Sequence, residues 1–155
     1  VSSSTLVTLP TSASITIVRR NPSSFLSMEL VTQIDISMPN QPGAMAKVTD
    51  ALRAAHVNIE AMYCTEGTAY STIHMVVDDV DTAKLALGVF GKIDTTPAFV
   101  TSVRNQPGAI ASAIRLCAGA GINIRNLICT SAGKEAMIVI TVNDIEKAKQ
   151  VFGIR

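Results

Sequence analysis

Apolar and polar residues alternate in several short segments of the chain, and this period of two predicts β-strands. The segments cover residues 31–38, 57–64, 71–77, 99–103, 122–130 and 135–142. Turn-forming residues separate the second segment from the third and the fifth from the sixth, so each of these pairs is predicted to form a hairpin. Residues 92–95 add one more short candidate strand.

Two longer segments carry apolar residues at helical spacing instead. The apolar positions are Met45, Val48, Leu52 and Ala55 in the first and Ile110, Ala113, Cys117 and Ala120 in the second. Shorter helices are expected over 80–89 and 145–152, each preceded by an aspartate, Asp79 or Asp144, that can cap it. The elements therefore occur in the same order in both halves of the chain.

The sequence itself repeats when it is shifted by 65 residues. Asn-Gln-Pro-Gly-Ala at 40–44 falls on the same five residues at 105–109, and Cys-Thr at 64–65 falls on 129–130. Asn-Ile at 58–59 also falls on 123–124, with no gap between these matches. The chain is therefore two copies of one unit.

Each unit has the order β-α-β-β-α-β, which predicts an α+β fold of the ferredoxin-like type, with two helices on one face of an antiparallel sheet. We expect a leader at 1–28, a first unit at 29–95 and a second unit at 96–155. The second unit has no room for a last strand of its own. Residues 15–18 alternate as a strand does, and they are the candidate to fill that edge.

The leader is rich in Ser and Thr, carries Arg19 and Arg20, and has no acidic residue before Glu29. Three interpretations stay open. It resembles an organelle transit peptide, it is vector-derived or flexible sequence before a start at Met28, or it is an added strand.

Composition excludes several functions. The hydrophobic fraction is 48%, the charged fraction 16% and the formal net charge +1, which argues against disorder and against a nucleic-acid partner. No apolar run approaches the roughly 18 residues of a membrane span. The three cysteines form no CxxC pair, so we expect a reduced, cytoplasmic location without a disulfide framework.

Other proteins with this fold need residues that the loop at 40–43 lacks. An acylphosphatase-like site needs an arginine there, and a metal chaperone needs a CxxC motif. An RNA-recognition motif needs aromatic residues on its central strands, whereas only the first unit offers any, Tyr63 and Tyr70.

No residue is a strong candidate for catalysis. His56 and His74 have no Cys, Asp or Ser partner at catalytic spacing, so a structural role is expected for both. Cys64 and Cys129 share one position of the repeat and are expected to be buried small hydrophobes. We therefore predict a protein that is not an enzyme and that needs no metal or cofactor.

The strand, the Asn-x-Pro-Gly-Ala turn, the amphipathic helix and the closing Val-Asn-Ile or Ile-Asn-Ile resemble the ACT domain, a small-molecule regulatory module of amino-acid metabolism. The resemblance covers both repeats, from about Leu30 to Gly153. It implies a tandem, stand-alone protein that binds a free amino acid where neighbouring units meet. The loop between the first strand and the helix would hold the ligand.

The physical chemistry of the loop agrees with that role. Gly43 and Gly108 let backbone N–H groups come close to a ligand, and a helix N-terminus attracts a carboxylate. Asn40 and Asn105 can both donate and accept hydrogen bonds. The candidate ligand-binding residues are Asn40, Gln41, Pro42, Gly43, Ala44, Met45, Asn58, Ile59, Asn105, Gln106, Pro107, Gly108, Ala109, Ile110, Asn123 and Ile124.

Two hypotheses about function follow. In the first, binding of an amino acid changes the assembly or the partner choice of the protein, which we expect to be a homodimer. In the second, the chain is a regulatory or structural subunit of a metabolic enzyme and has no ligand of its own. The turn motif alone is also compatible with a loop that binds nothing.

Overall fold

The computed structural model of the chain describes residues 27–155. Its elements are β1 (Glu29–Pro39), α1 (Ala44–Ala54), β2 (Ile59–Thr65), β3 (Tyr70–Val77), α2 (Val80–Leu87), β4 (Ile93–Arg104), α3 (Ala109–Gly119), β5 (Ile124–Ala132), β6 (Glu135–Val142) and α4 (Ile145–Phe152). The order strand, helix, strand, strand, helix occurs twice, as predicted. The candidate strand at 15–18 lies outside the described residues.

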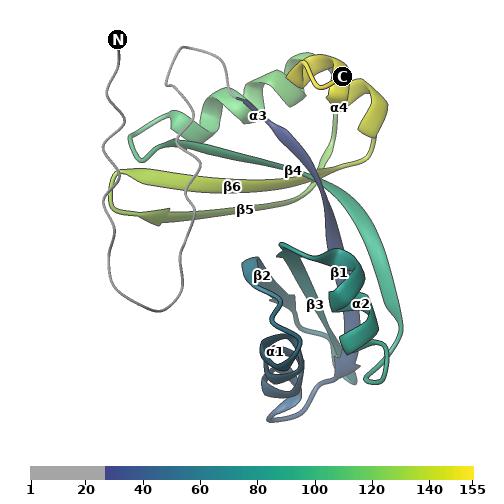
Figure 1. Cartoon of the computed structure of the whole chain (residues 1–155). Helices are drawn as coiled ribbons and strands as arrows, with labels where there is room; N and C mark the ends of the chain where they lie inside the picture. Colours follow the sequence, from purple (N-terminus) through teal and green to yellow (C-terminus); the bar gives the residue numbers. More distant parts are fainter. Residues whose placement is uncertain (1–26) are drawn as a thin grey trace.

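All six strands form one antiparallel sheet with the order β2-β3-β1-β4-β6-β5. The two central strands, β1 and β4, are long and run through both halves of the molecule (Figure 1). The first half is β2-β3-β1-β4 and the second is β5-β6-β4-β1, so each half has the ferredoxin-like order. The predicted fold class is confirmed.

The central strands supply the last strand that the second unit is predicted to lack. Gln33–Ile36 of β1 pairs with Ile93–Thr96 of β4 in the first half. In the second half, Ala98–Val100 of β4 pairs with Glu29–Val31 at the start of β1. Each half thus takes its fourth strand from the long strand of the other. Because β4 is continuous, the expected boundary between residues 95 and 96 falls inside a strand, and the division into units stays a prediction about the repeat.

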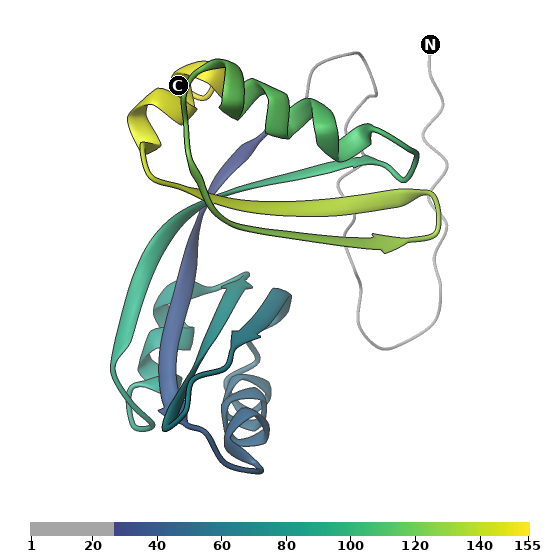
Figure 2. The same cartoon turned by 180° about the vertical axis from the view of Figure 1, so that it is seen from behind.

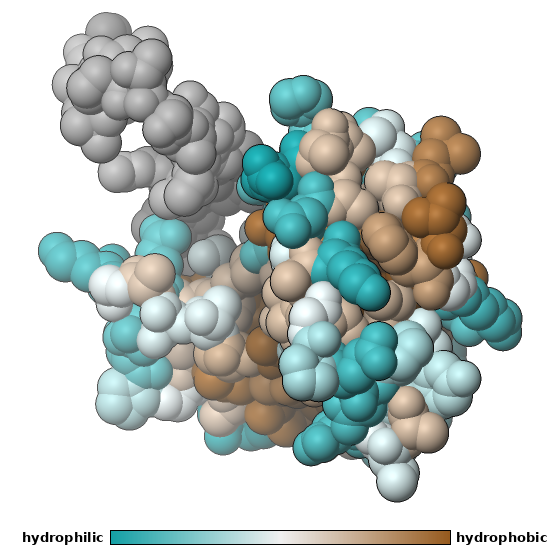
Figure 3. All heavy atoms as spheres, turned by 90° about the horizontal axis from the view of Figure 1, so that it is seen from below, coloured by the Kyte–Doolittle hydropathy of each residue, from teal (hydrophilic) through white to brown (hydrophobic). Residues whose placement is uncertain are grey.

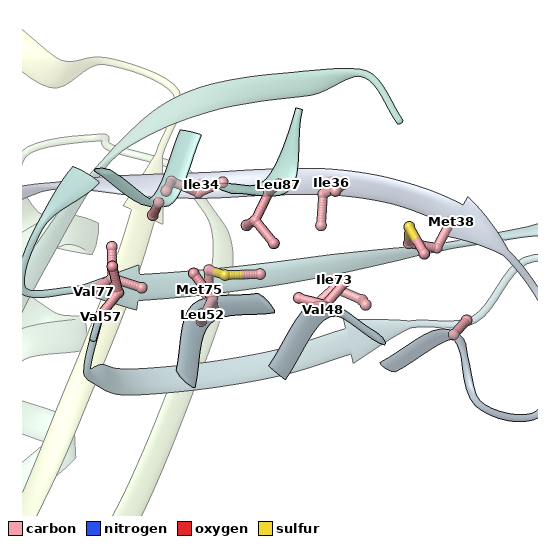
Figure 4. Close-up of a cluster of buried hydrophobic side chains, with 12 residues drawn as sticks. Ile34, Ile36, Met38, Val48, Leu52, Val57, Ile73, Met75, Val77 and Leu87 are labelled. Atoms are coloured by element: carbon pink, nitrogen blue, oxygen red, sulfur yellow. The ribbon is translucent and has the colours of Figure 1, made fainter. Parts of the chain in front are cut away.

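Both helix pairs cover the same face of the sheet, and each pair covers one half (Figures 1 and 2). Successive side chains of a strand point to opposite faces, so the even-numbered residues of β1 share one face. Ile34 packs with α1 and α2, whereas Leu30 packs beside Phe99 in the core under α3 and α4. Figure 4 shows the first core, in which Val48, Leu52 and Leu87 of the helices meet the strand residues.

The opposite face, which we call the inner face, carries a smaller apolar stripe to which all six strands contribute. Its buried members are Val76, Ala98 and Val139, and its partly buried members are Val31, Ala61, Val100, Ile128 and Met137. Seen from below, apolar residues gather at two places on the surface with hydrophilic residues between them (Figure 3). No helix within residues 27–155 is long and apolar enough to cross a membrane.

Candidate functional site

Each of the two repeated loops connects a central strand to the first helix of its half. Gly43 precedes α1 with φ 87° and Gly108 precedes α3 with φ 86°. A residue with a Cβ is strained at such a φ, which explains the glycine. A Cβ built at either position meets no atom within 4 Å, so the space beside each helix start is open.

The helices that follow these loops start without a capping side chain, in contrast to the other two helices. Asp79 caps α2 by accepting from the backbone N–H of Thr82 at 3.0 Å, and Asp144 caps α4 by accepting from that of Lys147 at 2.9 Å. Both predicted caps are therefore confirmed. The hydrogen bonds from Thr82, first from its backbone and then from its hydroxyl, lower the pKa of Asp79.

At α1 and α3 no side chain within residues 27–155 accepts from the first turn. Ala44 donates to the carbonyl of Gln41 at 3.2 Å, which leaves the backbone N–H groups of Met45 and Ala46 without a hydrogen-bond partner among the described residues. The N–H groups of Ile110 and Ala111 have the same place in α3. These free donors, at the positive end of the helix dipole, can bind a carboxylate.

The asparagine of each loop ties it to the tip of the neighbouring hairpin. The side-chain amide of Asn40 donates to the carbonyl of Gly67 at 2.9 Å, and that of Asn105 donates to the carbonyl of Gly133 at 3.1 Å. The amide N–H of each is thus used within the fold. The side-chain oxygen of each remains available as an acceptor among the described residues.

In the first half, a hollow of about 170 Å³ lies between the start of α1 and the sheet. It is lined by Met38, Pro39, Asn40, Gln41, Ala44, Met45, Cys64, Ser71 and Ile73. Sequence reasoning named loop residues from Asn40 onward but missed the other lining residues, Met38, Pro39, Cys64, Ser71 and Ile73. Apart from Pro39, their side chains lie on the helix-facing side by the alternation along the strands, and that signal could have found them.

In the second half, the corresponding hollow is wider, about 480 Å³, and its walls are different. It is lined only by the loop and the first turn of α3, residues 105–111, and no residue of β5 or β6 contributes. The two loops have the same sequence and backbone, yet only the first faces a hollow that the sheet closes from below.

The second group of predicted ligand residues lies away from the loops. The carbonyl of Asn58 accepts from the backbone of Asp78 at 3.1 Å, and the backbone of Asn40 donates to Ala69 at 2.9 Å. Strand β3 separates these two points and spans about 25 Å at its usual rise. Asn123 has the same relation to Asn105 across β6.

Within one chain, each Asn-Ile pair therefore lies at the end of its half that is near the centre of the molecule. Each loop lies at the opposite end of its half. The structure does not bring Asn58, Ile59, Asn123 or Ile124 to either loop. Ile59 and Ile124 instead pack against the first and second cores, respectively. Their predicted role in a ligand site stays a prediction.

The expected burial of two cysteines is wrong. Cys64 and Cys129 are exposed, because they lie near the outer ends of the edge strands β2 and β5. Cys117 is buried in the second core, and this burial raises the pKa of its thiol. All three cysteines are free thiols.

His74 has an acidic partner that spacing in the sequence did not reveal. It lies directly opposite Asp35 on the inner face, and its Nδ1 donates to the Asp35 carboxylate at 2.7 Å. Its Nε2 then accepts from the hydroxyl of Thr65 at 3.1 Å. Gln33 donates to Asp35 at 2.6 Å, and Thr96 donates to its second oxygen.

These hydrogen bonds run across β2, β3, β1 and β4, the whole width of the first half, and Tyr63 stacks on His74 with ring centroids 4.3 Å apart. The hydroxyl of Tyr63 is buried and has no hydrogen-bond partner among the described residues. Burial, together with the charge of Asp35, raises the pKa of Tyr63 against the lowering effect of Gln33. Residues 27–155 contain no group of three or more His, Cys, Asp or Glu residues that could hold a metal ion.

Solved structures share this fold over most of their length, whereas no curated protein matches the sequence. Protein BT0572 from Bacteroides thetaiotaomicron is 24% identical, with a TM-score of 0.75 over 82% of this chain and 89% of that one. The ligand-free regulatory subunit of aspartate kinase from Thermus thermophilus is 22% identical, with a TM-score of 0.60 over 81% and 94%. The corresponding subunit from Thermus flavus is 20% identical, with a TM-score of 0.58 over 84% and 95%.

At these identities the structural likeness concerns the fold, and the family follows from the sequence. The sequence profile of paired ACT domains matches residues 29–154, which include both repeated loops and all ten elements. With two interlocked ferredoxin-like halves and the same loop at the start of α1 and α3, the chain belongs to the ACT domain pair family.

Proposed function

We propose that the protein is a non-catalytic sensor that binds a free amino acid at the repeated loops and regulates amino-acid metabolism through its assembly or its choice of partner. The α-carboxylate binds the free N–H groups at the start of the helix, and the asparagine side-chain oxygen accepts from the α-ammonium group. A cytoplasmic location agrees with the three free thiols.

The observation that carries this proposal is the contrast between the helix starts. Helices α2 and α4 satisfy their first N–H groups with Asp79 and Asp144, whereas α1 and α3 leave theirs open beside a hollow. A carboxylate ligand supplies the acceptor that is missing in both repeats. The capping side chain is missing at two equivalent helix starts. Lack of room does not explain this, because the space beside both glycines is open.

The similar structures suggest what kind of partner such a sensor controls. Two of them are regulatory subunits of aspartate kinase, and this chain covers 94% and 95% of their lengths. We propose that a metabolic enzyme is a partner of this chain too. A homodimer is proposed because β2 and β5, at the two edges of the sheet, each pair with only one strand among the described residues.

A thermal-shift screen against the common amino acids tests the sensor. A ligand at about 100 times its Kd stabilises the folded state by about 2.7 kcal/mol, which corresponds to a rise in Tm of about 5 to 10 °C for a chain of this size. The same samples are measured by light scattering, because a sensor that acts through assembly changes its mass on binding.

No rise in Tm with any amino acid would contradict the sensor. If the chain then co-purifies with a large catalytic protein, the function is that of an enzyme subunit without its own ligand. A rise in Tm that persists when Gly43 and Gly108 are both replaced by valine would place the ligand elsewhere and would also contradict the proposed site.

A further inference from the structure

The first hollow is almost completely walled by uncharged, mostly apolar groups. Met38 and Ile73 are 3% and 2% exposed, and Ala44 is buried at the helix start above them. None of its nine lining residues carries a charged side chain. A charged ligand side chain placed here would lose hydration without gaining an ionic partner from the lining itself, which is costly. The nearest carboxylate is that of Glu66, which already accepts from the side chain of Asn40 at 3.3 Å.

Ser71 is a buried polar residue of this hollow that lacks a partner. It lies on β3 opposite Met38, on the helix-facing side, and it is 9% exposed. Its hydroxyl makes no hydrogen bond to any described residue, and it is not among the fully buried polar atoms without a partner, so it is open to the hollow. A polar atom of a ligand in the hollow can supply the missing bond.

The second half has neither a hydroxyl in place of Ser71 nor the same residues in place of Met38 and Pro39. Ala136 replaces Ser71, and Val103 and Arg104 replace Met38 and Pro39. The hollow beside the second loop has no floor from the hairpin strands, because only residues 105–111 line it. Both loops can bind a carboxylate, but only the first also encloses a side chain.

The size of the first hollow limits its occupant. Its volume of about 170 Å³ is below the range of about 300–1,000 Å³ that is usual for drug-sized ligands. An amino acid with a short side chain is of suitable size, whereas long side chains such as those of arginine or lysine would extend into solvent past Met45 or Gln41.

We infer that the first loop is the primary site and that its ligand is an amino acid with a short, uncharged side chain, which packs against Met38 and Ile73 and hydrogen-bonds to Ser71. This rests on the proposed function, because the α-carboxylate still binds the start of α1. It adds the class of ligand and an occupancy of one site per chain.

Alkylation of the cysteines by iodoacetamide tests this inference with the full chain. Cys64 lines the first hollow, and Cys129 has the same position in the second half, so the chain carries its own matched control. The alkylation rate of each cysteine is followed by mass spectrometry with alanine, serine, threonine or valine as probe, and with aspartate or lysine for comparison.

An uncharged probe at about 90% occupancy is expected to slow the alkylation of Cys64 about tenfold and that of Cys129 by less than about twofold. Stronger protection by aspartate or lysine, or equal protection of both cysteines, would overturn the inference. If an amino acid raises Tm but leaves the reactivity of Cys64 unchanged, the inference fails while the sensor stands. If no amino acid raises Tm, both fail.

A pair of substitutions that exchange the two halves tests the role of Ser71. Ser71→Ala introduces the residue of the second half and is expected to weaken binding about fivefold, the usual effect of one lost hydrogen bond. The reciprocal change, Ala136→Ser, is expected to leave the affinity unchanged. Equal affinity of the wild type and Ser71→Ala would show that the hydroxyl does not contact the ligand and would contradict this part of the inference.

Discussion

The two halves of the sheet are alike on the face that the helices cover and different on the inner face. Ile73 of the first core corresponds to Ile138 of the second, and both are buried. On the inner face, the hydrogen-bonded pair of Asp35 and His74 corresponds to Val100 and Val139. The repeat has therefore kept the packing that makes each half fold, while its inner face has diverged.

The two inner faces are stabilised in different ways. The second half relies mainly on apolar contact, which needs no particular geometry, although the buried hydroxyl of Thr141 on this face has no partner among the described residues. The first half depends on a network in which each polar group needs its partner, so it is more sensitive to the loss of one member. The predictions that follow compare the two halves, or the inner face of the first half with an exposed position, from the largest expected effect to the smallest.

Leu52 and Cys117 occupy the same position of the repeat, and both lie on the buried face of the first helix of their half, α1 or α3. Leu52→Ala removes more buried volume, so we expect it to lower the free energy of unfolding by about 2–5 kcal/mol. Cys117→Ala removes only a thiol and is expected to cost about 1 kcal/mol. Urea unfolding of both variants measures the difference. Equal losses would show that the loss of stability at this position does not follow the buried volume that is removed.

Asp35→Ala is expected to cost about 2 kcal/mol, because it leaves donors of His74, Gln33 and Thr96 without their acceptor. The double change Asp35→Val with His74→Val copies the inner face of the second half. It is expected to recover the part of that loss that is due to His74, because apolar packing often replaces a buried polar pair without a net cost, whereas Gln33 and Thr96 still lack their acceptor. A double variant that is less stable than Asp35→Ala would contradict this view of the inner face.

Gly43→Ala and Gly108→Ala place a Cβ on a backbone with positive φ. Because nothing else contacts that Cβ, the loss of stability is due to the backbone alone and should be nearly equal in the two halves, about 1 kcal/mol. Thermal unfolding measures both values. A much larger loss at one glycine would mean that the two loops are not equivalent as structures.

Tyr63→Phe removes a buried hydroxyl that lacks a partner, so we expect a gain or loss of less than about 1 kcal/mol at neutral pH. Burial raises the pKa of Tyr63 above its ordinary value of 10.0. Its contribution to stability is therefore complete below pH 10 and declines as the pH rises further, because the unfolded chain ionises first.

The stability of Tyr63→Phe should therefore fall less above pH 10 than that of the wild type. Tyr70→Phe, a change at an exposed position, should behave as the wild type does. The measurement is urea unfolding at pH 8 and above pH 10. The same alkaline decline in the wild type and in Tyr63→Phe would mean that ionisation of this phenol does not affect folding.

The elements and the repeat could be read from the sequence because they depend on local patterns. The helices follow the spacing of residues such as Val48 and Leu52, and the caps follow from Asp79 and Asp144. The merging of two predicted strands into β4 could not be read in the same way. It depends on the pairing of β4 with β1, which joins residues 57 to 71 positions apart in the sequence.

The candidate site was predictable where it is local and not where it depends on tertiary contacts. The loop with Asn40 and Gly43 is a contiguous motif, and its backbone conformation follows from the glycine. Ser71 and Cys64 reach the same hollow from the neighbouring hairpin, and only the register of β1, β2 and β3 places them there. The partner of His74 was missed for the same reason, since Asp35 lies on a different strand.

The central claim is that the helix start after the first loop holds the carboxylate of an amino acid. The most direct measurement is a titration followed by the backbone amide resonances in NMR, with the amino acid that gives the largest rise in Tm. We expect the amides of Met45 and Ala46 to shift most, with smaller changes at Ile110 and Ala111. Shifts centred on the inner face around His74, or none at either loop, would contradict the account.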